Sequence, residues 1–227
     1  MGNKTIKDIR LYKGGMRNEA GDAVTTSFAD KKLNAIVTRV VMKLRENEFS
    51  LGAFDHLYIH FIPADGIEKM RLEDNADRYH SWFQNCFVPI EMELYNDLCS
   101  AESYGDIIHW ISTVLITYFE TAEFSKERIL SCVQQAVEQG ENMRMQFKEK
   151  ATAKRRVVVF LRFLDTCRFS PLLHVYDGEG NLLFEQDLPE AVTLDYLGDL
   201  QISAKRVTIK PRKNAFTKQM TPLAFDY

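Results

Sequence analysis

Two short patterns in this sequence pair a carboxylate with an imidazole three residues later. They read Asp77-Arg-Tyr-His80 and Asp106-Ile-Ile-His109. On a helix, this spacing places both side chains on one face, as it does in carboxylate-bridged dimetal bundles. Such sites need further inward carboxylates, which Glu91 or Glu120 would have to supply. The patterns therefore suggest, as an alternative function, a small hydrolase or metal-dependent enzyme.

Two observations weigh against a metal site at these positions. The bundle pattern uses Glu where this chain has Asp, and Asp106 is also a natural first-turn acid near a helix N-terminus. His109 lies off the apolar stripe that begins at Ile107, whereas inward-facing ligands should sit on that stripe. We expect no metal and no cofactor, and packing or hydrogen-bonding roles for His80 and His109.

Other histidines and cysteines offer weaker chemistry. His56 and His60 share one face of a predicted strand, but ~13 Å would separate them along it, so they cannot chelate one ion. A turn at Ser170-Pro171 could bring Cys167 near His174 as a thiol and a base. No third group or family signature accompanies the pair, so a packed cysteine is the favoured interpretation.

Several common enzyme signatures are absent from the sequence. It contains no GxGxxG, GxxxxGK[ST], GxSxG or HExxH pattern. Their absence lowers the expectation of a Rossmann enzyme, a P-loop NTPase, an α/β-hydrolase or a zincin. A binding function is therefore favoured over a catalytic one.

The net charge of −3 hides an asymmetry along the chain. Residues 65–123 carry twelve Asp and Glu against three Lys and Arg, which is a local balance of −9. Residues 148–218 carry thirteen Lys and Arg against nine acids, a balance of +4. Each half could simply be keeping its surface soluble, or the acidic middle could present a face to a basic partner. The predicted partner-binding residues are Glu91, Glu93, Asp97, Glu102 and Asp106.

The basic C-terminal segment could in principle contact phosphates. It includes Lys205, Arg206, Lys210, Arg212, Lys213 and Lys218, with Phe216 nearby. A pI near 6.0 and the lack of interleaved aromatic residues argue against a nucleic-acid partner. We interpret the run as a solvated strand edge guarded by Lys and Arg.

Hydrophobic periodicity predicts helices in the first two thirds of the chain. An apolar stripe from Leu33 to Leu44 predicts a helix whose cap is Ser27, and residues 104–121 predict a second strong helix. The remaining predictions are strands at Lys4–Tyr12, ending at Gly14-Gly15, and at Phe54–Ile62, and helices from Pro89 to Leu98 and from Ser125 to Gly140.

Beyond a charged linker at Lys148–Arg156 the pattern changes to short apolar bursts, and turn residues separate them. Predicted strands are Val157–Leu164, Val192–Leu194, Arg206–Ile209, and a hairpin of Leu172–Tyr176 and Leu182–Glu185 around Asp177–Asn181. This order predicts the α+β class, with a helical acidic middle packed on a mainly antiparallel sheet and a C-terminal hairpin region. We expect one domain over 1–227, with a sub-boundary near 148–156 as the alternative and a poorly ordered tail at 211–227.

Other features suggest a cytoplasmic protein without a membrane partner. Four separated cysteines form no CxxC pair, and the N-terminus has charges but no apolar leader segment. The longest nearly apolar run, Ile107–Phe119, is shorter than the ~20 residues that a membrane span needs. The favoured function is a non-enzymatic intracellular protein-binding module, such as an immunity or inhibitor protein that neutralises a basic toxin.

Overall fold

The structure, a computed structural model, describes residues 3–17, 23–65, 69–73, 81–98 and 100–227. Within these ranges it holds four α-helices and twelve strands in three sheets. Most strand pairs are antiparallel, which confirms the α+β class. The chain divides into two compact units, residues 1–140 and 141–227. One domain over 1–227 stays a prediction.

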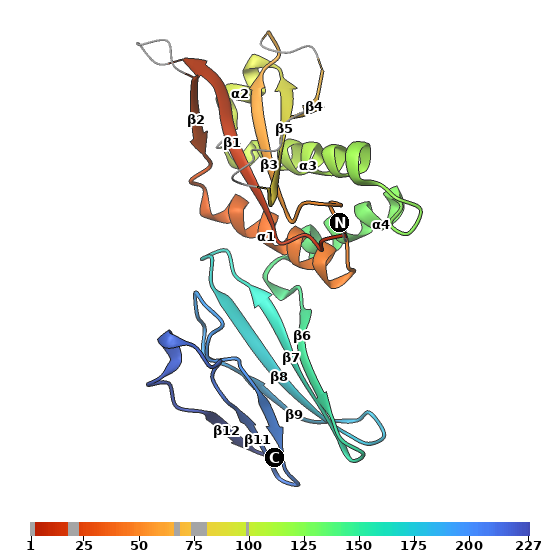
Figure 1. Cartoon of the computed structure of the whole chain (residues 1–227), viewed down its shortest axis with the longest axis vertical. Coiled ribbons are helices and arrows are strands. Elements are labelled where there is room, and N and C mark those ends of the chain that lie inside the picture. Colours follow the sequence, from red (N-terminus) through yellow and green to blue (C-terminus); the bar gives the residue numbers. More distant parts are fainter. Residues whose placement is uncertain (1–2, 18–22, 66–68, 74–80, 99) are drawn as a thin grey trace. The chain divides into compact units, whose positions relative to one another are not determined.

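The first unit is built around a mixed sheet of order β2-β1-β3-β5-β4 (Figure 1). Its strands are β1 (Asp8–Arg17), β2 (Ala23–Ser27), β3 (His56–Pro63), β4 (Arg71–Leu72) and β5 (Phe83–Ile90). The three central strands, β1, β3 and β5, pair in parallel, whereas β2 and β4 pair antiparallel at the edges. Parallel pairing needs a crossover connection, and α1 (Lys31–Glu46) lies on the one from β1 to β3.

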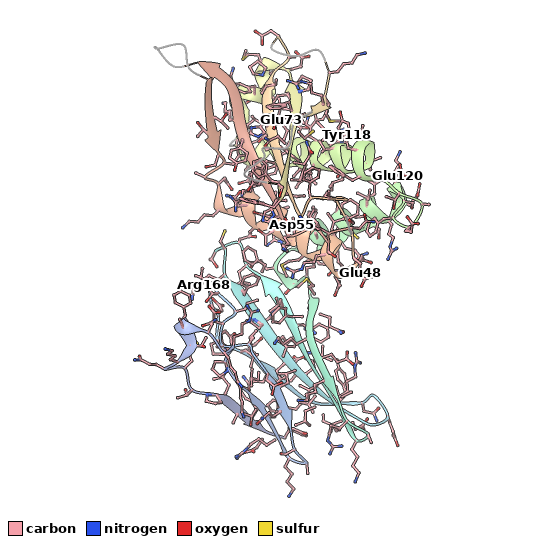
Figure 2. All side chains as sticks on the ribbon, in the orientation of Figure 1. Glu48, Asp55, Glu73, Tyr118, Glu120 and Arg168 are labelled. Carbon is pink, nitrogen blue, oxygen red and sulfur yellow. The ribbon has the colours of Figure 1, made fainter. Side chains whose placement is uncertain are left out.

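Helices follow the sheet in the chain and bury its inward face. They are α2 (Met92–Asp97), the short 3-10 turn η1 (Ala101–Ser103), α3 (Tyr104–Phe119) and α4 (Lys126–Gln139). Side chains alternate along β3, where Leu57, Ile59 and Phe61 are fully buried. Tyr118 of α3 donates its hydroxyl to the carbonyl oxygen of Met70 at 2.6 Å, which ties that helix to the segment before β4 (Figure 2).

Most of the predicted core stripes is confirmed, although Ile36 of α1 and Ile108 of α3 are only half-buried. On α1, Leu33, Val37, Val40 and Leu44 are buried, and on α3 Leu115 is fully buried. The cap of α1 differs from the prediction, because Asp30 and not Ser27 accepts a hydrogen bond from the backbone N–H of Leu33, at 2.7 Å. Ser27 is the last residue of β2. At the other end of the helical region, Gly140 ends α4 with a φ of 52°, as its position predicted.

Two predictions in the first unit are wrong. Strand β1 does not end at Gly14-Gly15 but runs to Arg17, and its register with β2 shifts between Lys13 and Met16. The glycines therefore lie at an irregularity inside the strand and not in a turn. Pro89 does not open a helix, because it lies in β5, which pairs with β3 as far as Ile90. Helix α2 begins only after Glu91.

The second unit contains a four-stranded sheet of order β6-β7-β8-β9 and a three-stranded sheet of order β10-β11-β12. The first consists of β6 (Met145–Ala151), β7 (Arg155–Phe163), β8 (Phe169–Asp177) and β9 (Leu182–Asp187). The second consists of β10 (Leu200–Ile202), β11 (Arg206–Ile209) and β12 (Leu223–Asp226). Strand β7 is internal in its sheet, and the β8–β9 hairpin turns at Asp177–Asn181; both agree with the sequence predictions.

Three further expectations differ from the structure of the second unit. Residues 148–156 are not a linker but lie in the β6–β7 hairpin, where the backbone N–H of Thr152 donates to the carbonyl of Arg155 at 2.7 Å. Residues 192–194 form no strand. The tail contains a 3-10 turn, η3 (Ala215–Thr217), and strand β12, which pairs with β11. Residues 148–156 resemble a linker because most of their charged side chains are exposed on the hairpin.

Candidate functional site: an acidic hollow on the first unit

The five predicted partner-binding carboxylates come from consecutive short elements of the first unit. Glu91 is the N-cap of α2, Glu93 lies in its first turn and Asp97 is its last residue. Glu102 belongs to η1, and Asp106 lies in the first turn of α3. All five are exposed.

Two buried residues of this region hold α2 in place. The Tyr95 hydroxyl donates a hydrogen bond of 2.9 Å to the carbonyl of Gly14 in β1, and its ring is 2% exposed. Leu98, just after the helix, is fully buried. The ammonium of Lys13 lies 4.3 Å from the centre of the Tyr95 ring. Helix α2, which carries Glu93 and Asp97 and is preceded by Glu91, is therefore anchored to the sheet.

The five carboxylates line one hollow of about 300 Å³ together with Leu94, Ser100 and Ser103. Among the residues that the structure describes, no side-chain hydrogen bond or ion pair engages any of the five carboxylates. Like charges gathered in a hollow reinforce one another's field and attract cations from solution. We name this feature the acidic hollow.

Part of the acidic hollow has a structural explanation. Glu93, Glu102 and Asp106 lie in the first turns of their elements, where a carboxylate interacts favourably with the positive end of a helix. Glu91, the N-cap of α2, lies at the same positive end of that helix, and only Asp97, its last residue, has no such role. The dipole therefore accounts for some of these acids but not for their grouping around one hollow.

The structure gives no metal centre to the Asp-x-x-His patterns that it describes. No group of three or more His, Cys, Asp or Glu side chains is placed to hold an ion within the described ranges. Asp106 and His109 are both exposed on α3. Asp77 and His80 lie outside the described residues, so the first pattern stays a hypothesis.

Both histidines of β3 lie within hydrogen-bond distance of a polar neighbour. His56 Nδ1 lies 2.6 Å from Asp55 Oδ1, and His60 Nε2 lies 3.0 Å from Asn85 Oδ1. Burial lowers the pKa of His60 below its ordinary value, against the opposing effect of that hydrogen bond. Burial alone would raise the pKa of Asp55, labelled in Figure 2, but hydrogen bonds from Lys7 and His56 lower it.

Cys167 and His174 do not form a nucleophile–base pair. Cys167 lies in the β7–β8 turn with a φ of 60°, whereas His174 lies in the middle of β8 opposite Val158. The imidazole instead contacts the Tyr176 hydroxyl at 2.8 Å and Glu185 Oε2 at 2.7 Å. Cys86 is buried, and its burial raises the pKa of the thiol to about 12, which suits packing rather than nucleophilic chemistry.

Comparisons with protein-family models, with curated proteins and with solved structures found no match to this chain. No helix within the described residues is long and apolar enough to cross a membrane.

Proposed function

We propose that this chain is a non-enzymatic protein-binding module whose acidic hollow receives a basic partner. The observation that supports the proposal is the grouping of five exposed carboxylates around one hollow, with no cation paired to any of them among the described residues. A partner that supplied Lys or Arg side chains would relieve the repulsion between these carboxylates. An immunity or inhibitor protein that neutralises a basic toxin has this chemistry.

The anchoring of α2 favours partner recognition over a role of these acids in keeping the surface soluble. Because Tyr95 ties α2 to β1 and Leu98 is fully buried, the carboxylates of this helix start from an anchored backbone. A preorganised surface loses less conformational entropy when a partner binds. Electrostatic attraction of this kind raises the association rate more than the final affinity, and added salt weakens it.

The test compares two doubly substituted chains. Glu93→Lys with Asp97→Lys reverses charge in the acidic hollow, whereas Glu123→Lys with Glu138→Lys makes the same charge change at exposed positions elsewhere in the first unit. The immobilised wild-type chain and both variants are exposed to proteins of the native host, and the bound proteins are quantified by mass spectrometry. We expect basic proteins that the wild type and the control variant retain and that the hollow variant loses.

The binding kinetics of a protein captured in this way provide the second readout. Charge reversal in the hollow should slow association by roughly tenfold and leave dissociation less affected. Equal losses in both variants would mean that net charge, and not the acidic hollow, governs binding. A captured set that is unchanged by the hollow substitutions would refute the proposal.

A further inference from the structure

A second and larger hollow lies entirely within the second unit and has the opposite charge. Its volume is about 1040 Å³. One carboxylate, Asp199, and five cationic side chains line it: Lys148, Lys210, Arg212, Lys213 and Lys218. We name this feature the basic hollow, and it stands independently of the acidic hollow and its proposed partner.

A close approach between two backbone segments builds one wall of the basic hollow. The N–H of Gly198 donates to the carbonyl of Lys210 at 2.8 Å, and the N–H of Arg212 donates to the carbonyl of Asp195 at 2.8 Å. A Cβ on residue 198 would lie 2.4 Å from the Lys210 carbonyl oxygen, so only glycine fits there. This approach fixes the backbone from which Lys210 and Arg212 project.

Lys148 enters the hollow from a different sheet. Its ammonium donates from β6 to the carbonyl oxygen of Gly198. Burial lowers the pKa of Lys148, the positive charge of Arg212 lowers it further, and Asp199 opposes both effects. Lys148 therefore experiences the field of a neighbouring cation as well as partial desolvation.

The single carboxylate leaves most of this positive charge uncompensated. Asp199 Oδ1 lies 3.8 Å from the ammonium of Lys150, which is not among the residues that line the basic hollow. Within the described part of the chain, no carboxylate lies within ion-pair distance of Lys210, Arg212, Lys213 or Lys218.

We infer that the basic hollow is a binding site for clustered phosphate groups. Arginine presents a planar fork of donors that matches phosphate oxygens, and lysine supplies point charges. Five cations exceed what one phosphate group would engage, and the volume is that of a pocket for a ligand larger than an inorganic ion. A soluble oligophosphate and the headgroup of a phosphorylated lipid share this chemistry.

An exposed aromatic side chain allows a lipid headgroup to be distinguished from a soluble oligophosphate. Phe216 of η3 is 84% exposed, and it lies between Asn214 and Thr217, which both line the basic hollow. Met220, a further lining residue, is 41% exposed. An apolar side chain beside a cationic pocket inserts into the interfacial region when the phosphate belongs to a lipid headgroup. Phe216 would contribute little to the binding affinity for a soluble ligand.

The first experiment measures binding of sodium tripolyphosphate to the intact chain by isothermal titration calorimetry. The variant carries Lys213→Gln and Lys218→Gln, and the control carries Lys154→Gln and Lys205→Gln, which removes the same charge from exposed positions of the same unit. We expect the variant to bind about tenfold more weakly and the control to remain within about twofold of the wild type. Circular dichroism of both variants checks that they are folded.

The second experiment repeats the comparison in a cosedimentation assay. The vesicles consist of phosphatidylcholine with or without phosphatidylinositol bisphosphate. A lipid source predicts that Phe216→Ser loses most vesicle binding and keeps tripolyphosphate binding, whereas a soluble source predicts tripolyphosphate binding alone. The inference is overturned if the wild type binds neither probe, or if the variant and its control lose binding equally.

Discussion

The two hollows of this molecule carry opposite charge and are built in different ways. The acidic hollow gathers its carboxylates from α2, η1 and α3, which are consecutive in the chain. The basic hollow combines Lys148 of β6 with residues 198–222, and the contact from Lys148 to Gly198 joins residues 50 positions apart. The first depends on anchored helices, and the second depends on a close backbone approach. Their sensitivities to substitution should therefore differ.

The largest expected effect tests whether the units depend on each other. Leu115→Ala in α3 removes a fully buried side chain and should destabilise the first unit by ~2–5 kcal/mol. Both tryptophans of the chain, Trp82 and Trp110, lie in that unit, so tryptophan fluorescence during urea unfolding reports on it. The control is Leu130→Ala, at a position that is 40% exposed, which should change stability much less.

Hydrogen exchange of the second unit completes this test. If the units fold separately, protection in β7 and β8 should be the same in Leu115→Ala as in the wild type. A parallel loss of protection would show that the two units form one cooperative domain, as the sequence analysis expected.

A glycine substitution gives the next largest effect and should act on the basic hollow. Gly198→Ala places a Cβ 2.4 Å from the Lys210 carbonyl oxygen and should cost about 1–3 kcal/mol in the second unit. Gly105→Ala is the matched change beside the acidic hollow, where a Cβ meets no atom within 4 Å. It should be neutral or slightly stabilising, because alanine is the better helix former. Differential scanning calorimetry of both variants measures the two changes in stability.

The helix cap of the first unit should have a smaller effect. Asp30→Ala removes the side-chain acceptor for the Leu33 N–H and should destabilise α1 by about 1 kcal/mol. Asp30→Asn keeps an acceptor oxygen and should retain most of the stability. Fluorescence-detected urea melts measure both, and equal losses in the two variants would contradict a capping role.

The smallest effect is a pH dependence that both units should share. The pKa values of His60 and His174 are lowered, in both cases mainly by burial, so the folded chain disfavours the protonated imidazoles. The unfolded chain then binds more protons, and stability falls as pH drops through and below the ordinary pKa of about 6.5. Thermal melts between pH 7.5 and 5.5 should show this fall. His60→Gln should reduce the fall that tryptophan fluorescence reports for the first unit and leave the fall in the second unit unchanged.

The long helices α1 and α3 and most of their buried faces could be predicted from the sequence. The α1 and α3 stripes follow helical periodicity, and the β8–β9 hairpin follows from the local turn chemistry of Asp177–Asn181. Pro89 misled the prediction because its preference for a helix start was outweighed by pairing of β5 with β3, a partner remote in sequence. Strand β12 was missed because it pairs only through β11.

The two candidate sites also differ in how far local sequence predicts them. The five carboxylates fall within residues 91–106, so local sequence alone was enough to select them as one group. From the sequence, the basic residues of the tail are interpreted as a strand edge. Nothing local indicated that Lys148 joins them or that Gly198 allows the approach of residues 210–212. Long-range backbone packing creates the basic hollow, so the spacing of residues in the sequence cannot predict it.

The parallel pairing of β1 with β3 also has a consequence for the order of folding. Strand β1 cannot pair with β3 until β2 and α1, which lie between them in the chain, have been accommodated. In the second unit, β6 to β9 pair with their immediate neighbours in sequence. Closing short loops costs less entropy, and low contact order accompanies fast folding. On refolding from denaturant, the sheet of the second unit should therefore form before the mixed sheet, although its residues come later in the chain.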